Sequence, residues 1–100
     1  MSLPVEVLSG ADAELQGIVN RFEEYREGFG IEFATAVDAY LARISLFPEI
    51  APVYFGKVRR QVMRGFPYGI FYEPYPTRIL VAAILDLRQD PLRIRRRLQH

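Results

Sequence analysis

Apolar side chains in the first half of the chain recur at steps of three and four residues, the period of a helix with one buried face. We expect a first helix to begin near Ser9, where Ser9-x-x-Asp12 has the spacing of a capping box. A second helix should end before Pro48, because a residue preceding proline avoids the helical region. Gly28 and Gly30 separate the two, which predicts an antiparallel helical hairpin. The expected buried positions are Ala11, Leu15, Ile18, Val19, Phe22 and Tyr25, then Phe33, Val37, Tyr40, Leu41 and Ile44.

The opposite face of the first helix is charged and should lie in solvent. The side chains expected there are Glu14, Arg21, Glu23, Glu24 and Glu27.

The remaining apolar positions follow the two-residue period of strands. A short strand is expected at residues 3–8, and after a loop at 48–56 three more at 57–66, 68–73 and 78–87. Short turns join these three, so they should pair antiparallel. The 78–87 strand is apolar on both faces, which indicates a central strand covered on both sides. The order β-α-α-β-β-β predicts an α+β fold, a helical hairpin packed on a mainly antiparallel four-stranded sheet, in a single domain spanning residues 1–100.

Composition limits the classes of protein that fit. One hundred residues make one domain with a single core and no separate cofactor domain, so we expect no cofactor. The chain has no cysteine, which excludes disulfides and a thiolate-bound metal, and we expect no metal site. No apolar run approaches the roughly 20 residues that span a bilayer, and no secretory signal is evident. The expectation is a cytoplasmic protein without a membrane partner.

Charge divides the chain into two unlike halves. Residues 1–56 carry nine acidic and three basic side chains, for −6, whereas residues 57–100 carry ten basic and three acidic ones, for +7. Such a division suggests an anionic partner for the basic half. The alternative is that the two halves attract each other within the fold.

Several short segments together resemble the RelE/ParE toxin superfamily, over nearly the whole chain from about Val5 to Arg97. They are the turn Gly28-Phe29-Gly30-Ile31-Glu32-Phe33, Phe47-Pro48, Arg59-Arg60, Phe66-Pro67-Tyr68-Gly69-Ile70-Phe71-Tyr72 and Ala83-Ile84-Leu85-Asp86-Leu87-Arg88-Gln89-Asp90-Pro91. Members of this family are the toxins of toxin–antitoxin pairs. The resemblance therefore implies a cognate antitoxin as partner, and a homodimer in its absence is a further alternative.

The resemblance leaves two modes of action open. RelE-like members cleave messenger RNA on the ribosome, and typical ones have an arginine where this chain has Gly69 and a histidine where it has Asp86. The only histidine here is the terminal His100, and Tyr68, Tyr72 and Tyr75 fit packing roles better than proton transfer. We therefore expect no catalytic residue. ParE-like members inhibit DNA gyrase without hydrolysis, and the arginine-rich tail after Asp90-Pro91 is more similar to this branch. An inert family member that only binds antitoxin is a third alternative.

Arginines are the candidate contacts to the target, because the planar guanidinium grips carboxylate or phosphate at two points. Arg60 and Arg64 could instead pair with glutamates of the first helix, and Arg88 with Asp86 or Asp90. The candidates are Arg59, Arg60, Arg64, Arg88, Arg93, Arg95, Arg96 and Arg97. Leu92, Ile94 and Leu98 could dock the tail on the sheet.

Three aromatic side chains are candidates for binding the antitoxin: Phe29, Tyr54 and Phe55. They exceed what the core of such a chain needs, and exposed apolar surface marks interfaces. Alternatively, Tyr54 and Phe55 fold back over the sheet.

Overall fold

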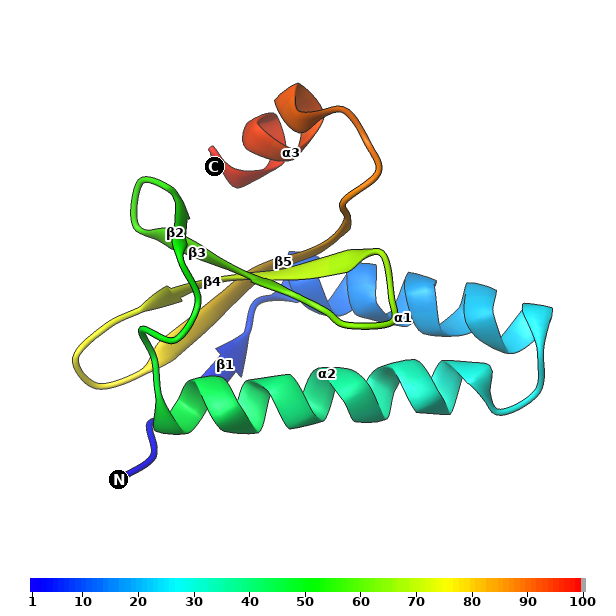
Figure 1. Cartoon of the computed structure of the whole chain (residues 1–100), viewed down its shortest axis with the longest axis horizontal. Coiled ribbons are helices and arrows are strands. Elements are labelled where there is room, and N and C mark those ends of the chain that lie inside the picture. The colour runs from blue at the N-terminus through cyan, green and yellow to red at the C-terminus, as the bar shows by residue number, and fades with distance from the viewer. Residues whose placement is uncertain (100) are drawn as a thin grey trace.

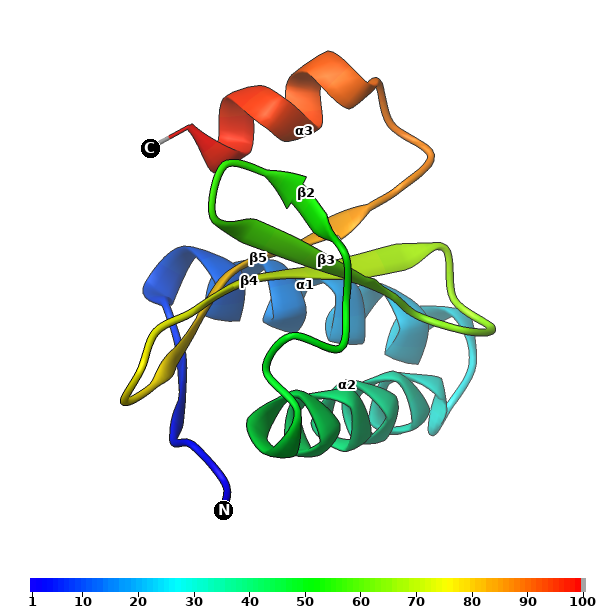
Figure 2. The ribbon, with the colours of Figure 1, turned by 60° about the vertical axis from the view of Figure 1, so that its left-hand side comes forward.

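Residues 1–99 are described by a computed structural model, in which a helical hairpin covers one face of a sheet and a third helix lies on the other (Figure 1). The elements follow in the order β1 (Val5–Val7), α1 (Ser9–Tyr25), α2 (Phe29–Leu46), β2 (Val53–Phe55), β3 (Val58–Val62), β4 (Tyr68–Pro74), β5 (Ile79–Asp86) and α3 (Pro91–Leu98). Figure 2 shows α1 and α2 below the sheet and α3 above it. The predicted α+β class and the helical hairpin are confirmed.

The sheet has the strand order β1-β5-β4-β3-β2. Only β1 runs parallel to its neighbour, β5, whereas the other neighbours pair antiparallel. The sheet therefore has five strands and not four, because β2 lies within the segment expected to be a loop. Its signal is weak in the sequence, since the strand has three residues, follows Pro52 and contains a register shift between Val53 and Phe55.

Side chains of β4 and β5 fill a core on each face of the sheet. Toward the hairpin, Ile70, Tyr72 and Val81 pack with Phe33 and the other buried side chains of α1 and α2. Toward α3, the buried Phe71, Ala83 and Leu85 pack with Ile94. The prediction that the last strand is covered on both sides is confirmed, and the tail forms a helix that docks through Ile94 and Leu98.

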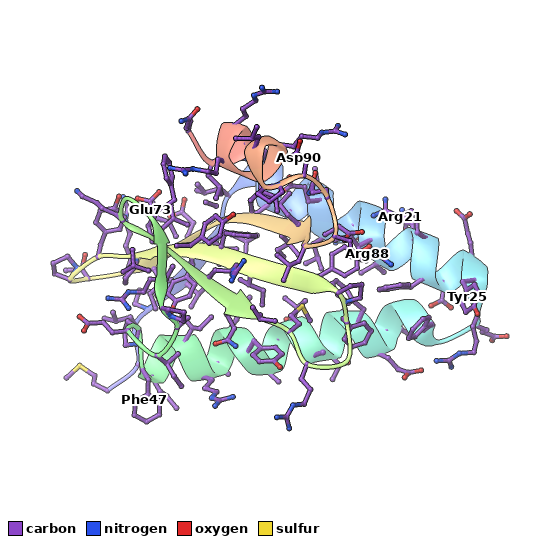
Figure 3. The ribbon with its side chains drawn as sticks, turned by 45° about the horizontal axis from the view of Figure 1, so that its top comes forward. Arg21, Tyr25, Phe47, Glu73, Arg88 and Asp90 are labelled. Atoms are coloured by element: carbon purple, nitrogen blue, oxygen red, sulfur yellow. The ribbon has the colours of Figure 1, made fainter. Side chains whose placement is uncertain are left out.

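Three expectations for α1 are wrong. Leu8 is the N-cap residue and no side chain caps the helix, so the Ser9-x-x-Asp12 capping box does not form. Tyr25 is 81% exposed at the end of the hairpin, because it lies beyond the edge of the sheet that the helix covers (Figure 3). Glu14 is partly buried, since its carboxylate binds the backbone of β5 and a side chain of α3.

The turn between α1 and α2 is closed by a carboxylate from α1. Glu23 accepts hydrogen bonds from the backbone N–H groups of Gly28 (2.8 Å) and Gly30 (3.0 Å), which begin α2. Gly28 has a φ of 84°, a conformation that favours glycine. A Cβ at Gly30 would lie 2.5 Å from the Val19 carbonyl oxygen, so α1 and α2 approach this closely only because residue 30 is glycine.

We predict that Glu23→Ala lowers the free energy of unfolding by about 1 kcal/mol, the usual cost of losing a cap at a helix N-terminus. The measurement is urea denaturation followed by circular dichroism. The control is Glu24→Ala, since Glu24 is also an exposed glutamate of α1 but makes no hydrogen bond among residues 1–99. Equal effects of the two substitutions would contradict the capping role of Glu23.

Candidate functional site

The Arg59 side chain stabilises the fold by donating hydrogen bonds to two backbone carbonyl groups. Its guanidinium donates to the carbonyl oxygens of Ala51 (2.7 Å) and Glu49 (3.3 Å), in the connection between α2 and β2. The same connection is also bound by the buried Tyr72, whose hydroxyl donates to the Pro48 carbonyl (2.8 Å). Arg59 is therefore a positioning group for residues 48–52 and is only partly available to a target.

Arg97 is also engaged, in a link between α3, α1 and the edge of β5. It pairs with Glu14 (2.9 Å) and donates to the carbonyl oxygen of Ala82 (3.0 Å), while Glu14 accepts from the N–H of Ile84 (3.2 Å). The Arg97 guanidinium fits here because residue 10 is glycine: a Cβ at Gly10 would lie 2.7 Å from Arg97. Sequence reasoning missed Glu14, since no local pattern predicts a contact across 83 residues.

Arg88 forms the local pair with Asp86 that the sequence suggested. The Arg88 guanidinium donates to both oxygens of the Asp86 carboxylate, at 3.0 and 2.7 Å. This hydrogen bonding, together with smaller contributions from the Arg88 backbone N–H and from Arg21, holds the pKa of the Asp86 carboxyl below its ordinary value. Figure 3 shows Arg88 and Asp90 on the connection from β5 to α3, with Arg21 beside it on α1.

Two other arginines stack on aromatic rings of β2. The guanidinium of Arg60 lies 4.7 Å from the ring centre of Tyr54, and that of Arg95 lies 4.6 Å from the ring centre of Phe55. Tyr54 in turn packs edge-on against the buried Phe71. Both rings thus belong to the α3 side of the sheet, as in the alternative in which they fold back over it. Their predicted role in antitoxin binding stays a prediction, as does that of Phe29, which packs against Phe22 and Phe66.

Arg60 has a buried nitrogen without a partner. Among residues 1–99, its Nε is the one buried side-chain nitrogen or oxygen that makes no hydrogen bond. Such a group is costly in a folded protein and calls for an explanation, such as a ligand. The ion pairs expected between Arg60 or Arg64 and glutamates of the first helix are absent from the described part of the chain. That expectation is wrong because Arg60 points to the α3 side, away from α1.

The last three candidates are exposed and carry no ion pair within residues 1–99: Arg64, Arg93 and Arg96. Arg93 and Arg96 lie on α3. Arg64 lies elsewhere, in a groove beside Tyr40 and Arg43 of α2. The structure therefore does not gather the eight arginines into one patch. Arg60 lies on the face of the sheet that α3 covers, Arg93, Arg95 and Arg96 lie on α3 itself, and Arg64 lies apart from them.

Gly69 and Asp86 are the two positions at which the sequence differs from typical nuclease members of the family that it resembles. Gly69 is buried beneath Leu87, and a Cβ there would lie 2.9 Å from the Leu87 side chain. Asp86 is held in its pair with Arg88. A side chain at residue 69 would therefore require the Leu87 side chain to move.

The tyrosines have structural partners. Tyr68 packs edge-on against Phe33, and Tyr72 anchors the 48–52 connection. Burial raises the pKa of the Tyr72 hydroxyl above its ordinary value. Tyr75 donates to the Glu73 carboxylate (2.8 Å), a hydrogen bond that raises the pKa of the Tyr75 hydroxyl. Both hydroxyls are protonated at neutral pH, as tyrosines ordinarily are, and act as hydrogen-bond donors; the raised pKa values extend this to higher pH.

No group of three or more His, Cys, Asp or Glu side chains within residues 1–99 could hold a metal ion. None of the helices in this range is both long enough and apolar enough to span a membrane.

Comparison of the structure with solved structures gives a match over most of the chain. A chain of the "Chromosomal ParDE TA system from P. aeruginosa" superposes with a TM-score of 0.76 and 12% sequence identity, covering 87% of this chain and 98% of that chain. The sequence matches no protein-family model, and no curated protein matches it. At this identity the likeness concerns the fold: the chain has the RelE/ParE-like toxin fold.

We predict that Arg97→Met lowers the free energy of unfolding by roughly 1–3 kcal/mol, because it leaves the Ala82 carbonyl and the Glu14 carboxylate without their shared partner. Methionine keeps the length of the apolar stem. Urea denaturation measures the effect, and Arg96→Met is the matched control on the exposed side of α3. Similar losses for both variants would show that Arg97 contributes no more than any other arginine of the helix.

Proposed function

We propose that this chain is the toxin of a type II toxin–antitoxin pair and that it acts by binding DNA gyrase, without catalysis. The observation that carries the proposal is the fold, which matches a chain of a ParDE system over 87% of the present one. A cognate antitoxin as partner follows from the same likeness. A ribosome-dependent endoribonuclease with a divergent site is the second candidate, because the fold is common to both branches of the superfamily.

Two features of the sheet favour a binding mode of action. The face under α3 is filled by apolar side chains, with Leu87 over Gly69 and with Ile94 against Phe71 and Leu85. RNA cleavage needs groups that move a proton at the 2′-hydroxyl and stabilise the charge of the transition state. Asp86 is ionised at neutral pH and is paired with Arg88, which lowers its pKa further, so Asp86 itself offers no positive charge to a phosphate. The arginines of α3 provide charge without such a centre.

The contact surface that we propose consists of Arg60, Arg93, Arg95 and Arg96. Arg60 and Arg95 are pre-oriented by Tyr54 and Phe55, so less side-chain freedom is lost when they bind. The buried Nε of Arg60 lacks a hydrogen-bond acceptor that an anionic group of a partner would provide. Arg93 and Arg96 present exposed guanidinium groups on the same side of the sheet.

The first functional prediction concerns the mode of action. Purified protein should inhibit DNA supercoiling by gyrase and should leave messenger RNA intact on programmed ribosomes. Gel electrophoresis of plasmid topoisomers and primer extension on the message measure the two activities. Codon-positioned cleavage would replace the proposal with the endoribonuclease, and inactivity in both assays together with antitoxin binding would favour the inert family member.

The second functional prediction concerns the surface. Arg93→Gln with Arg96→Gln should weaken gyrase inhibition by about tenfold or more, since interface arginines often contribute over 1 kcal/mol each. The matched control is Arg26→Gln with Arg78→Gln, which removes the same charge from two exposed arginines outside α3. Unfolding midpoints verify that both variants fold. Equal inhibition by the two double variants would move the target surface away from α3.

A further inference from the structure

A bulge in β5 changes which of its backbone groups face away from the sheet. Two consecutive residues of β4 lie opposite Val81 and Ala83, so Ala82 between them has no partner in β4. Before the bulge, the carbonyl of Val81 points outward and accepts from the N–H of Leu8 (3.1 Å). The carbonyl of Ala82 itself accepts from Arg97 (3.0 Å). The extra residue shifts the alternation of the strand by one position from there on.

Beyond the bulge, the outward edge of β5 is open. The N–H of Ile84 points away from β4 and donates to the Glu14 carboxylate (3.2 Å). The N–H of Leu87 points toward β4 and donates to the Pro67 carbonyl (2.9 Å). Because backbone groups alternate along a strand, the carbonyl of Ile84 and the N–H of Asp86 both face outward. β1 does not extend this far, so an acceptor and a donor stand side by side on an edge without a neighbouring strand.

A pocket of about 260 Å³ lies against this edge. It is lined by both Ile84 and Leu85, whose side chains belong to opposite faces of the sheet, so the pocket contacts the strand from its edge. Its floor is α1, which lies below the sheet in Figure 2. Ala13 and Gly17 are one turn apart on this floor and have no bulky side chain. They leave room for a planar ring that lies in the plane of the sheet.

The pocket contains a tyrosine hydroxyl without a partner. Tyr68 is 5% exposed, yet its hydroxyl makes no hydrogen bond within residues 1–99. The hydroxyl oxygen is not fully enclosed, so it opens into the pocket that Tyr68 lines. The ring is held in place by edge-on packing against Phe22 and Phe33. Because an unpaired polar group in such a position is costly, the hydroxyl calls for a ligand.

Arg21 adds a cation to the same pocket. Figure 3 shows it on α1 beside the connection from β5 to α3. It forms no ion pair within residues 1–99, whereas Asp86, which also lines the pocket, is already paired with Arg88. A guanidinium group binds phosphate or stacks on the face of a heterocycle. Arg21 is therefore available to either part of a nucleotide.

We propose that the pocket beside β5 binds a free nucleotide, whose base takes the place of a strand at the open edge. Bases carry an N–H donor next to an acceptor, as adenine does with its 6-amino group and N1. These two groups complement the carbonyl of Ile84 and the N–H of Asp86. The ring lies over Gly17, the Tyr68 hydroxyl donates to a further ring nitrogen, and Arg21 binds the phosphate.

Two other occupants fit this pocket less well. A polypeptide strand would need the N–H of Ile84, which the Glu14 carboxylate already occupies. A phosphate or carboxylate without a base would leave the outward carbonyl of Ile84 unpaired and would face the carboxylate of Asp86. The volume is also below that of most pockets for drug-sized ligands and suits a single base with its sugar. Glu14 lines the pocket and binds Arg97, so the site adjoins the link that holds α3.

Nuclear magnetic resonance of the ¹⁵N-labelled protein tests the site directly. Adenosine monophosphate at about 1 mM should shift the amide signals of Leu85 and Asp86 and slow hydrogen exchange at Asp86. Its N6,N6-dimethyl derivative lacks the amino donor and should bind about tenfold more weakly, and ribose 5-phosphate should cause no shift. Equal shifts with ribose 5-phosphate, or none with adenosine monophosphate, would overturn the proposal. Tighter binding of single-stranded oligoadenylate per base would overturn it in favour of a nucleic acid.

Two substitutions test the pocket itself. Tyr68→Phe removes only the hydroxyl and should weaken binding of adenosine monophosphate by about three- to tenfold. Gly17→Leu fills the floor and should abolish binding, whereas Gln16→Leu, an exposed neighbour on α1, should retain it. Binding retained by Gly17→Leu would overturn the proposal. Where that variant fails to fold, unchanged affinity of Tyr68→Phe would do so. None of these readouts uses gyrase or an antitoxin, so the result is independent of the proposed function.

Discussion

The sheet must be covered on both faces, and most of the architecture follows from this requirement. In β4, Ile70, Phe71 and Tyr72 are fully buried although they alternate between the two faces. A hairpin of two long helices covers one face. On the other face lies the short helix α3, which buries Ile94 against β4 and β5 and leaves Arg93 and Arg96 exposed.

The position of α3 is fixed by several small contributions. Its N-terminus is capped by Asp90, which accepts from the Leu92 N–H (2.9 Å), and Pro91 occupies the first turn, where its missing N–H is not needed. Burial of Ile94 contributes roughly 1.5–3 kcal/mol at most. An eight-residue helix would not persist alone in water, so packing and the Glu14–Arg97 pair hold it in place. The direction of the exposed arginines thus depends on a carboxylate of α1.

The sequence was sufficient to predict the helices and strands in which apolar residues recur with a clear period. It was insufficient to predict the contacts between these elements. The stripe of α1 and α2 and the apolar β5 were predicted because each signal extends over many residues. β2 was missed, since three residues with a bulge show no alternation. Which arginines are engaged was also unpredictable. Arg59 and Arg60 are adjacent, yet one serves two carbonyls of the chain and the other stacks on Tyr54, because neighbouring residues of a strand face opposite sides.

Few of the opposite charges on the two halves of the chain pair with each other within the fold. Of the four ion pairs within residues 1–99, two join the halves, Glu6 to Arg78 and Glu14 to Arg97. The other two, Arg26 with Glu32 and Asp86 with Arg88, lie within one half. Attraction between the halves therefore involves two of the ten basic side chains after residue 56, and exposed pairs such as Glu6–Arg78 contribute little stability. Intramolecular pairing does not explain the excess of arginine, whereas anionic partners at separate surfaces would require it.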